Sequence, residues 1–80
     1  MADKQLRNEI MVTVNKFANP MIDHSCFPSE SAHSVDYAIE QLFDLGLIEA
    51  KYSSTDIDNH WTAYGITTKG KIYMEEEGLS

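Results

Sequence analysis

The sequence is poor in cysteine, in proline and in basic side chains, since its 80 residues include one Cys, two Pro and six Lys or Arg. The single cysteine, Cys26, cannot form an intramolecular disulfide, which excludes a disulfide-stapled secreted scaffold and favours the reducing cytoplasm. Uninterrupted apolar runs are only a few residues long, far below the roughly 20 residues of a membrane-spanning helix. Because the first residues do not resemble a signal peptide either, we expect a soluble, cytoplasmic protein.

Acidic residues outnumber basic ones throughout the chain. Thirteen Asp or Glu against six Lys or Arg give a net charge of −7. Residues 1–45 hold three basic and seven acidic side chains, and residues 46–80 hold three and six. Neither half therefore offers the concentrated positive charge that binding to nucleic-acid phosphates requires. The length predicts one domain over residues 1–80, with residues 78–80 as a disordered tail.

Two segments have the spacing of amphipathic helices. In the first, apolar side chains recur every three or four positions, at Leu6, Ile10, Val14 and Phe17. This pattern predicts a helix over residues 4–18 with Asp3 as its N-cap. The helix should end at Asn19-Pro20, because the residue before proline avoids the helical region.

The second amphipathic segment has the more regular pattern. Its apolar face is formed by Val35, Ala38, Ile39, Leu42 and Phe43. We predict a helix over residues 35–45, with Ser34 as the N-cap and Gly46 as the left-handed residue that ends it. The stretch before it, residues 21–34, has no regular pattern and is interpreted as a short strand and a loop.

From residue 47 the pattern changes to the alternation typical of strands. Residues 47–52 and 61–66 predict a β-hairpin, joined by a polar loop over residues 53–60. A last helix is predicted over residues 68–77, with Thr67 as its N-cap. The apolar side chains expected to anchor this helix to the core are Ile66, Ile72 and Met74.

The order of these elements predicts an α+β fold and resembles a small winged-helix domain. Such a domain has three helices and a two- or three-stranded β wing, and the second helix of its helix-turn-helix would be short or degenerate here. Residues 35–48 are similar to the third helix of that family and its exit at a glycine, and residues 64–74 are similar to the segment after the second wing strand. In that segment Gly70 would permit close approach of the last helix to its neighbour.

Among winged helices, the sequence is most similar to small proteins of phages and prophages such as the YjcQ-like group. The resemblance implies a phage origin and the host cytoplasm as the place of action. Together with the acidity, it implies an inhibitor that occupies a nucleic-acid channel on a host protein, as DNA mimics and some anti-CRISPR proteins do.

The helix that would read DNA in a winged-helix protein carries no Lys or Arg. Its exposed side chains are expected to be Asp36, Tyr37, Glu40, Gln41 and Asp44, and the wing adds Asp56, Ile57, Asp58 and Trp61. Because DNA binding begins with the neutralisation of phosphates, we predict that this face binds a partner protein with a basic surface instead. For Trp61, cross-strand packing and contact with a partner both remain open.

The alternative is a transcription regulator that binds DNA as a dimer through its basic side chains. These are Lys4, Arg7, Lys16, Lys51, Lys69 and Lys71. Independently of DNA binding, a homodimer is predicted through the first helix, where Met11 and Val12 flank the main apolar stripe and could join Met21 in an apolar patch.

Histidine and cysteine occur together in the irregular part of the chain and on the wing, at His24, Cys26, His33 and His60. Structural zinc sites usually pair their ligands about two to four residues apart in two groups, and this spacing differs. A Cys-His nucleophile with Asp23 nearby lacks an evident orienting group and oxyanion site. We therefore expect no metal, no cofactor and no catalytic residues, with Cys26 and Phe27 at the edge of the core.

Overall fold

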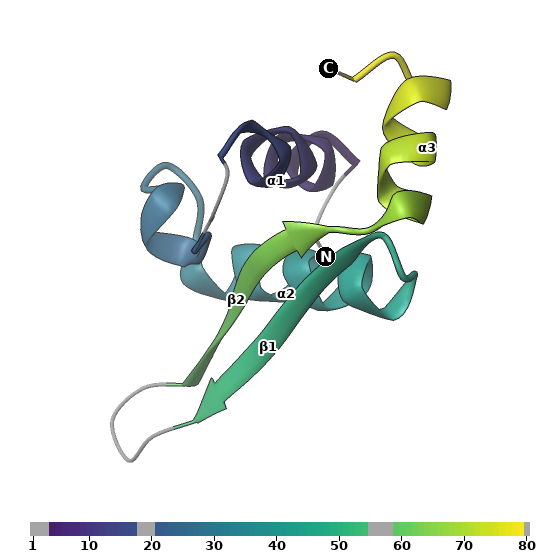
Figure 1. The fold of residues 1–80 in the computed structure, drawn as a ribbon. Coiled ribbons are helices and arrows are strands. Elements are labelled where there is room, and N and C mark those ends of the chain that lie inside the picture. Colours follow the sequence, from purple (N-terminus) through teal and green to yellow (C-terminus); the bar gives the residue numbers. More distant parts are fainter. Residues whose placement is uncertain (1–3, 18–20, 55–58, 80) are drawn as a thin grey trace.

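The structure is a computed structural model that describes residues 4–17, 21–54 and 59–79. In chain order its elements are α1 (Lys4–Lys16), the 3-10 helix η1 (His24–Cys26), α2 (Ala32–Asp44), β1 (Ile48–Ser54), β2 (Asn59–Ile66) and α3 (Thr68–Glu76). β1 and β2 pair as a two-stranded antiparallel sheet. α1 and α2 contact each other and the hairpin, and α3 lies beside the end of the hairpin where β1 begins and β2 ends (Figure 1). The described residues thus form a small α+β domain.

α1 contributes the apolar stripe that the sequence predicts, with two differences. Leu6, Ile10 and Val14 are buried as expected, but Met11 is completely buried beside them. Met11 is therefore a core residue, and the prediction that it belongs to an exposed dimer patch is wrong. Phe17, predicted to be in the core, is 55% exposed because α1 ends one residue before it. The predicted Asp3 cap and the Asn19-Pro20 stop lie outside the described residues.

α2 begins one turn earlier than predicted. Its N-cap is Ser31, whose Oγ accepts a hydrogen bond from the Ser34 N–H at 3.1 Å. Ser34, the predicted cap, instead lies inside the first turn. At the other end the predicted role of Gly46 is confirmed, since its φ is +75° and the Leu47 N–H donates to the Leu42 carbonyl at 3.0 Å. This six-to-one bond defines a Schellman motif, which turns the chain into β1.

The hairpin is longer than predicted. Ser53 pairs with His60 and Ser54 with Asn59, so both ends of the predicted loop are strand residues. Residues 55–58, with Asp56, Ile57 and Asp58 of the predicted site, lie outside the described residues. A third short strand is reduced to one bridge on the other edge of β2. There the Ile22 N–H donates to the Ala63 carbonyl at 2.9 Å, and the Ala63 N–H donates to the Ile22 carbonyl at 2.8 Å.

α3 is capped as predicted, since Thr67 Oγ1 accepts the Gly70 N–H at 2.9 Å. A Cβ on Gly70 would overlap the Leu47 carbonyl, so this glycine does allow close approach to the chain before β1. Met74 is buried, whereas Ile72, predicted as an anchor, is 50% exposed because it lies on the outer side of α3.

The chain after α3 is also more structured than predicted. Gly78 has a φ of +70°, and the Leu79 N–H donates to the Met74 carbonyl at 2.8 Å. Leu79 packs against the core. In place of the expected disordered tail, residues 78 and 79 therefore form a second Schellman cap. Ser80 lies outside the described residues.

None of the helices found in the described ranges combines the length and the apolar character that crossing a bilayer would require. The only element between α1 and α2 in these ranges is the three-residue η1, which begins after Asp23. The arrangement is compatible with a winged-helix-like layout.

Candidate functional site

The side chains of α2 point in three directions. Val35, Ala38, Ile39 and Leu42 face the core. Gln41 faces α1, where its Oε1 accepts a hydrogen bond from Arg7 Nη1 at 3.2 Å. Asp36 and Phe43 face the hairpin through their contacts with Trp61. The predicted partner-binding face is therefore divided, and Gln41 belongs to the α1–α2 contact.

A groove lies where the exposed face of α2 meets the hairpin. Its volume is about 190 Å³. Its lining residues, which define the α2–hairpin groove, are His33, Asp36, Tyr37, Glu40, Tyr52 and Trp61. The structure thus brings together four of the nine predicted partner-binding residues and adds a histidine and a tyrosine that the prediction did not include.

Trp61 is the central aromatic side chain of this groove. It is half-buried against the core. Its ring centroid lies 5.4 Å from that of Tyr52, its cross-strand partner, and 5.5 Å from that of Phe43 on α2. These spacings are typical of packed aromatic pairs. Trp61 therefore packs across the hairpin, which is one of the two alternatives that the sequence left open, and it also lines a surface groove. Contact of Trp61 with a partner stays a prediction.

Asp36 holds the hairpin to α2 through the backbone of Trp61. The backbone groups of Ala63 point to Ile22, away from β1, and strand residues two positions apart point to the same edge. The Trp61 N–H consequently faces that open edge, where Asp36 Oδ1 accepts it at 3.3 Å. The carboxylate satisfies a donor that would otherwise be open to another strand. Asp36 is thus a structural residue as well as a groove residue.

Glu40 and Asp44 are the exposed carboxylates on the same side of α2. In the part of the chain that the structure describes, neither side chain makes an ion pair or a hydrogen bond. No Lys or Arg is among the described residues that line the groove. The groove therefore combines aromatic surface with uncompensated negative charge.

The six basic residues of the alternative DNA-binding surface are distributed over α1, β1 and α3. Lys4 Nζ lies 3.6 Å from Glu77 Oε2, and Arg7 is bonded to Gln41. Lys51 lines a separate hollow on the sheet with Met21, whereas Lys71 borders hollows beside the C-terminal part of α1. No single described groove contains more than one of the six.

The histidines and the cysteine do not assemble into one cluster. The His24 and His60 rings meet edge to face with their centroids 6.0 Å apart, while His33 lies on α2 at the groove. Cys26 is exposed, so its predicted place at the edge of the core is wrong; η1 directs it outward and Phe27 packs inward. Within the described ranges no three His, Cys, Asp or Glu side chains could hold a metal ion.

Asp23 is the N-cap of η1. Its Oδ1 accepts the Ser25 hydroxyl at 2.5 Å and the Ser25 N–H at 2.9 Å. The bond from the Ser25 hydroxyl is the main cause that lowers the pKa of Asp23, and burial opposes it, while the Ser25 N–H and the nearby His24 and His60 lower the pKa further. Because hydrogen bonds from Ser25 favour the charged form of the Asp23 carboxylate, it is this charged form that caps η1.

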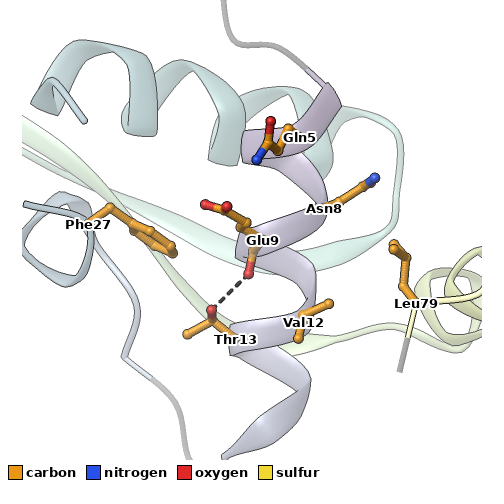
Figure 2. A pocket seen from close by; sticks show the side chains of 7 residues that line it. All are labelled: Gln5, Asn8, Glu9, Val12, Thr13, Phe27 and Leu79. Carbon is orange, nitrogen blue, oxygen red and sulfur yellow. Dashed lines mark hydrogen bonds between the residues drawn. The ribbon is translucent and has the colours of Figure 1, made fainter. Parts of the chain in front are cut away.

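A second hollow runs along the outer face of α1 between Phe27 and Leu79 (Figure 2). Its volume is about 460 Å³. The lining is amide, hydroxyl and apolar, and the Thr13 hydroxyl is occupied because it donates to the Glu9 carbonyl at 2.8 Å. Among the described lining residues Glu9 is the one with an ionisable side chain, so these residues offer neither a pair of acid and base groups nor a set of metal ligands.

The groove residues that sequence reasoning missed are His33 and Tyr52, and Phe43 was assigned to the core although it is 42% exposed. His33 lies one helical turn before Tyr37, so a start of the helix at Ala32 would have placed it on the exposed face. Tyr52 shares a strand face with Ile48 and Ala50 and pairs with Trp61.

Comparison with known proteins gives no match, neither to a family model, nor to a curated protein, nor to a solved structure.

Proposed function

We propose that the chain is a non-enzymatic interaction module that binds a basic surface of a partner protein through the α2–hairpin groove, which includes Glu40, and through the adjoining Asp44. The observation that carries the proposal is the pairing of aromatic surface with carboxylates that have no cationic partner among the described residues. Aromatic side chains are enriched at protein interfaces, and unpaired charges of one sign select a partner of the opposite sign.

The proposal includes a winged-helix fold. In support of it, α1, the Ile22 bridge, η1, α2 and the hairpin follow one another in the order of that fold, with η1 in the place of a degenerate second helix. α2 would then be the helix that reads DNA in other members. A phage-encoded winged helix with an acidic α2 would dock on the nucleic-acid-binding surface of a host protein and act as an inhibitor.

The test compares two double variants with the same change in net charge. Glu40→Lys with Asp44→Lys reverses the charge of one carboxylate in the groove and of one beside it, whereas Glu75→Lys with Glu76→Lys reverses two exposed carboxylates on α3. Asp36 is left intact because it bonds the Trp61 N–H. Proteins captured from a host lysate should be retained by the wild type and by the α3 variant and lost by the α2 variant.

The captured proteins are identified by mass spectrometry, and we expect them to be enriched in proteins that have a nucleic-acid-binding surface. The folded state of both variants is checked by circular dichroism. If the α3 variant loses the same proteins as the α2 variant, net charge and not the groove governs binding, and the proposal is wrong.

A further inference from the structure

We propose that the α2–hairpin groove takes one arginine side chain of the partner, with the guanidinium group against the aromatic rings and between the carboxylates of α2. The inference rests on the proposed function and specifies which group the groove recognises. It is argued from the size of the groove, from its aromatic lining and from the placement of its two carboxylates.

The volume of about 190 Å³ limits what the groove can hold. Sites for small-molecule ligands usually measure about 300–1,000 Å³. The groove is also open along the surface of α2, where Tyr37 and Glu40 contribute to its wall. It therefore suits a single long side chain presented by another protein better than a whole cofactor or nucleotide.

The aromatic lining favours a flat cation. Trp61, the ring type that binds cations best, packs against the rings of both Tyr52 and Phe43. Tyr52 is more than half exposed, so a face of this aromatic cluster is open to a partner. A guanidinium group can stack on such a ring while its N–H groups remain free for hydrogen bonds, which a lysine ammonium cannot do.

The two carboxylates supply the acceptors for those N–H groups. Asp36 and Glu40 are four residues apart on α2, so their side chains lie on one face of the helix. The Trp61 N–H fixes Asp36 through Oδ1. Since a carboxylate has about four acceptor positions, this bond leaves Asp36 able to accept from a ligand, and Glu40 makes no bond within the described residues. Paired carboxylates recognise the fork of arginine donors.

The probe is the blocked tripeptide Gly-Arg-Gly, compared with the same peptide containing lysine or citrulline in place of arginine. Citrulline has nearly the shape of arginine without its charge. Trp61 is the only tryptophan of the chain, so its fluorescence and the NMR signal of its indole N–H report directly on the groove. At about pH 8, the arginine peptide should shift both signals with a millimolar dissociation constant, about −4 kcal/mol.

Binding of the lysine peptide should be weaker by about threefold or more, and the citrulline peptide should bind weakest. Glu40→Gln and Tyr52→Leu should each weaken the arginine peptide by about fivefold. Their matched controls, Glu49→Gln and Tyr64→Leu, change exposed residues that do not line the groove and should leave binding unchanged.

Equal binding of the arginine and citrulline peptides would overturn the inference, as would equal effects of the groove variants and their controls. No shift of the Trp61 signals by about 10 mM arginine peptide would also overturn it. If these outcomes occur while Glu40→Lys with Asp44→Lys still abolishes protein capture, the proposed function stands and only the recognition of arginine fails.

Discussion

Asp36 is an acidic surface residue whose hydrogen bond stabilises the fold. Its Oδ1 accepts the Trp61 N–H at 3.3 Å on the open edge of β2. Removing one partner of such a bond leaves a donor unsatisfied, which costs about 1–3 kcal/mol when the donor is buried. Because Trp61 is only half-buried, we expect Asp36→Ala to lower the free energy of unfolding by about 1 kcal/mol.

The measurement is urea denaturation, with Glu40→Ala as the matched control. Glu40 is exposed and unbonded within the described residues, so its loss should change the free energy of unfolding by less than about 0.5 kcal/mol. Asp36→Asn keeps an oxygen acceptor and should lie between the two. Equal destabilisation by the two alanine variants would contradict the structural role of Asp36.

Asp23 makes stability depend on pH in the acid range. The Ser25 hydroxyl bond lowers its pKa in the folded state, so the unfolded chain binds a proton more readily than the folded one as the pH falls. The stabilisation is therefore fully present above the unfolded pKa, near 3.9 for aspartate, and is lost as the pH falls through the lower folded pKa.

We expect Asp23→Asn to be less stable than the wild type at pH 7, by less than about 1 kcal/mol because solvent screens the group. The difference should shrink below about pH 4. Thermal unfolding of both proteins between about pH 2 and pH 7 measures it. A difference that grows as the pH falls has the opposite sign and would rule out this origin.

Among the elements, the start of α2 is where local sequence was ambiguous. Both Ser31 and Ser34 satisfy the preference for serine at an N-cap. In the structure Ser31 Oγ accepts a hydrogen bond from the Ser34 N–H, and the backbone of Ser31 is extended, as is typical of an N-cap residue. Ser31→Ala should therefore cost about 1 kcal/mol of stability.

Ser34→Ala keeps the backbone donor and the cap, so it should cost clearly less than Ser31→Ala. Urea denaturation of the two variants separates the two helix starts. A larger cost for Ser34→Ala would indicate that α2 begins at Val35, as the sequence pattern alone predicts.

The type and order of the long elements followed from the sequence because each has a strong period and a stop signal. Gly46 and Thr67 are examples, since their roles depend only on neighbours in the chain. Tertiary contacts decided the rest. Met11 is buried and Phe17 exposed because α1 packs on α2 and ends early, and Ser53 and Ser54 extend β1 because the opposite strand continues to pair with them.

The arrangement of the candidate site was also predictable only in part. Helical spacing predicted that Asp36, Tyr37 and Glu40 lie on one face of the helix, and in the structure all three line the same groove. The split of that face between α1 and the hairpin was not predictable, because the bonds of Gln41 to Arg7 and of Asp36 to Trp61 join residues 34 and 25 positions apart. Such long-range pairs leave no local pattern in one sequence.

At the scale of the whole molecule, the net charge of −7 is unevenly compensated. On one side of α1, Lys4 pairs with Glu77, whereas the carboxylates beside the α2–hairpin groove face no cation among the described residues. Association with a basic partner through that region should consequently be faster at low ionic strength.

The same charge distribution predicts that the protein does not bind duplex DNA. The six basic residues lie on three elements, and no single described groove contains more than one of them. α2 exposes the carboxylates of Glu40 and Asp44, which would repel phosphates. If six phosphate contacts did form, lowering the salt from about 150 mM to 50 mM would raise the affinity by two to three orders of magnitude. We expect no mobility shift of random duplex DNA at about 50 mM salt and micromolar protein.

The variant Glu40→Lys with Asp44→Lys removes repulsion and adds two cations on α2, so it should bind DNA more strongly than the wild type and serves as the positive control. A wild-type shift that weakens steeply with salt would show instead that Lys4, Arg7, Lys16, Lys51, Lys69 and Lys71 act as a DNA-binding surface.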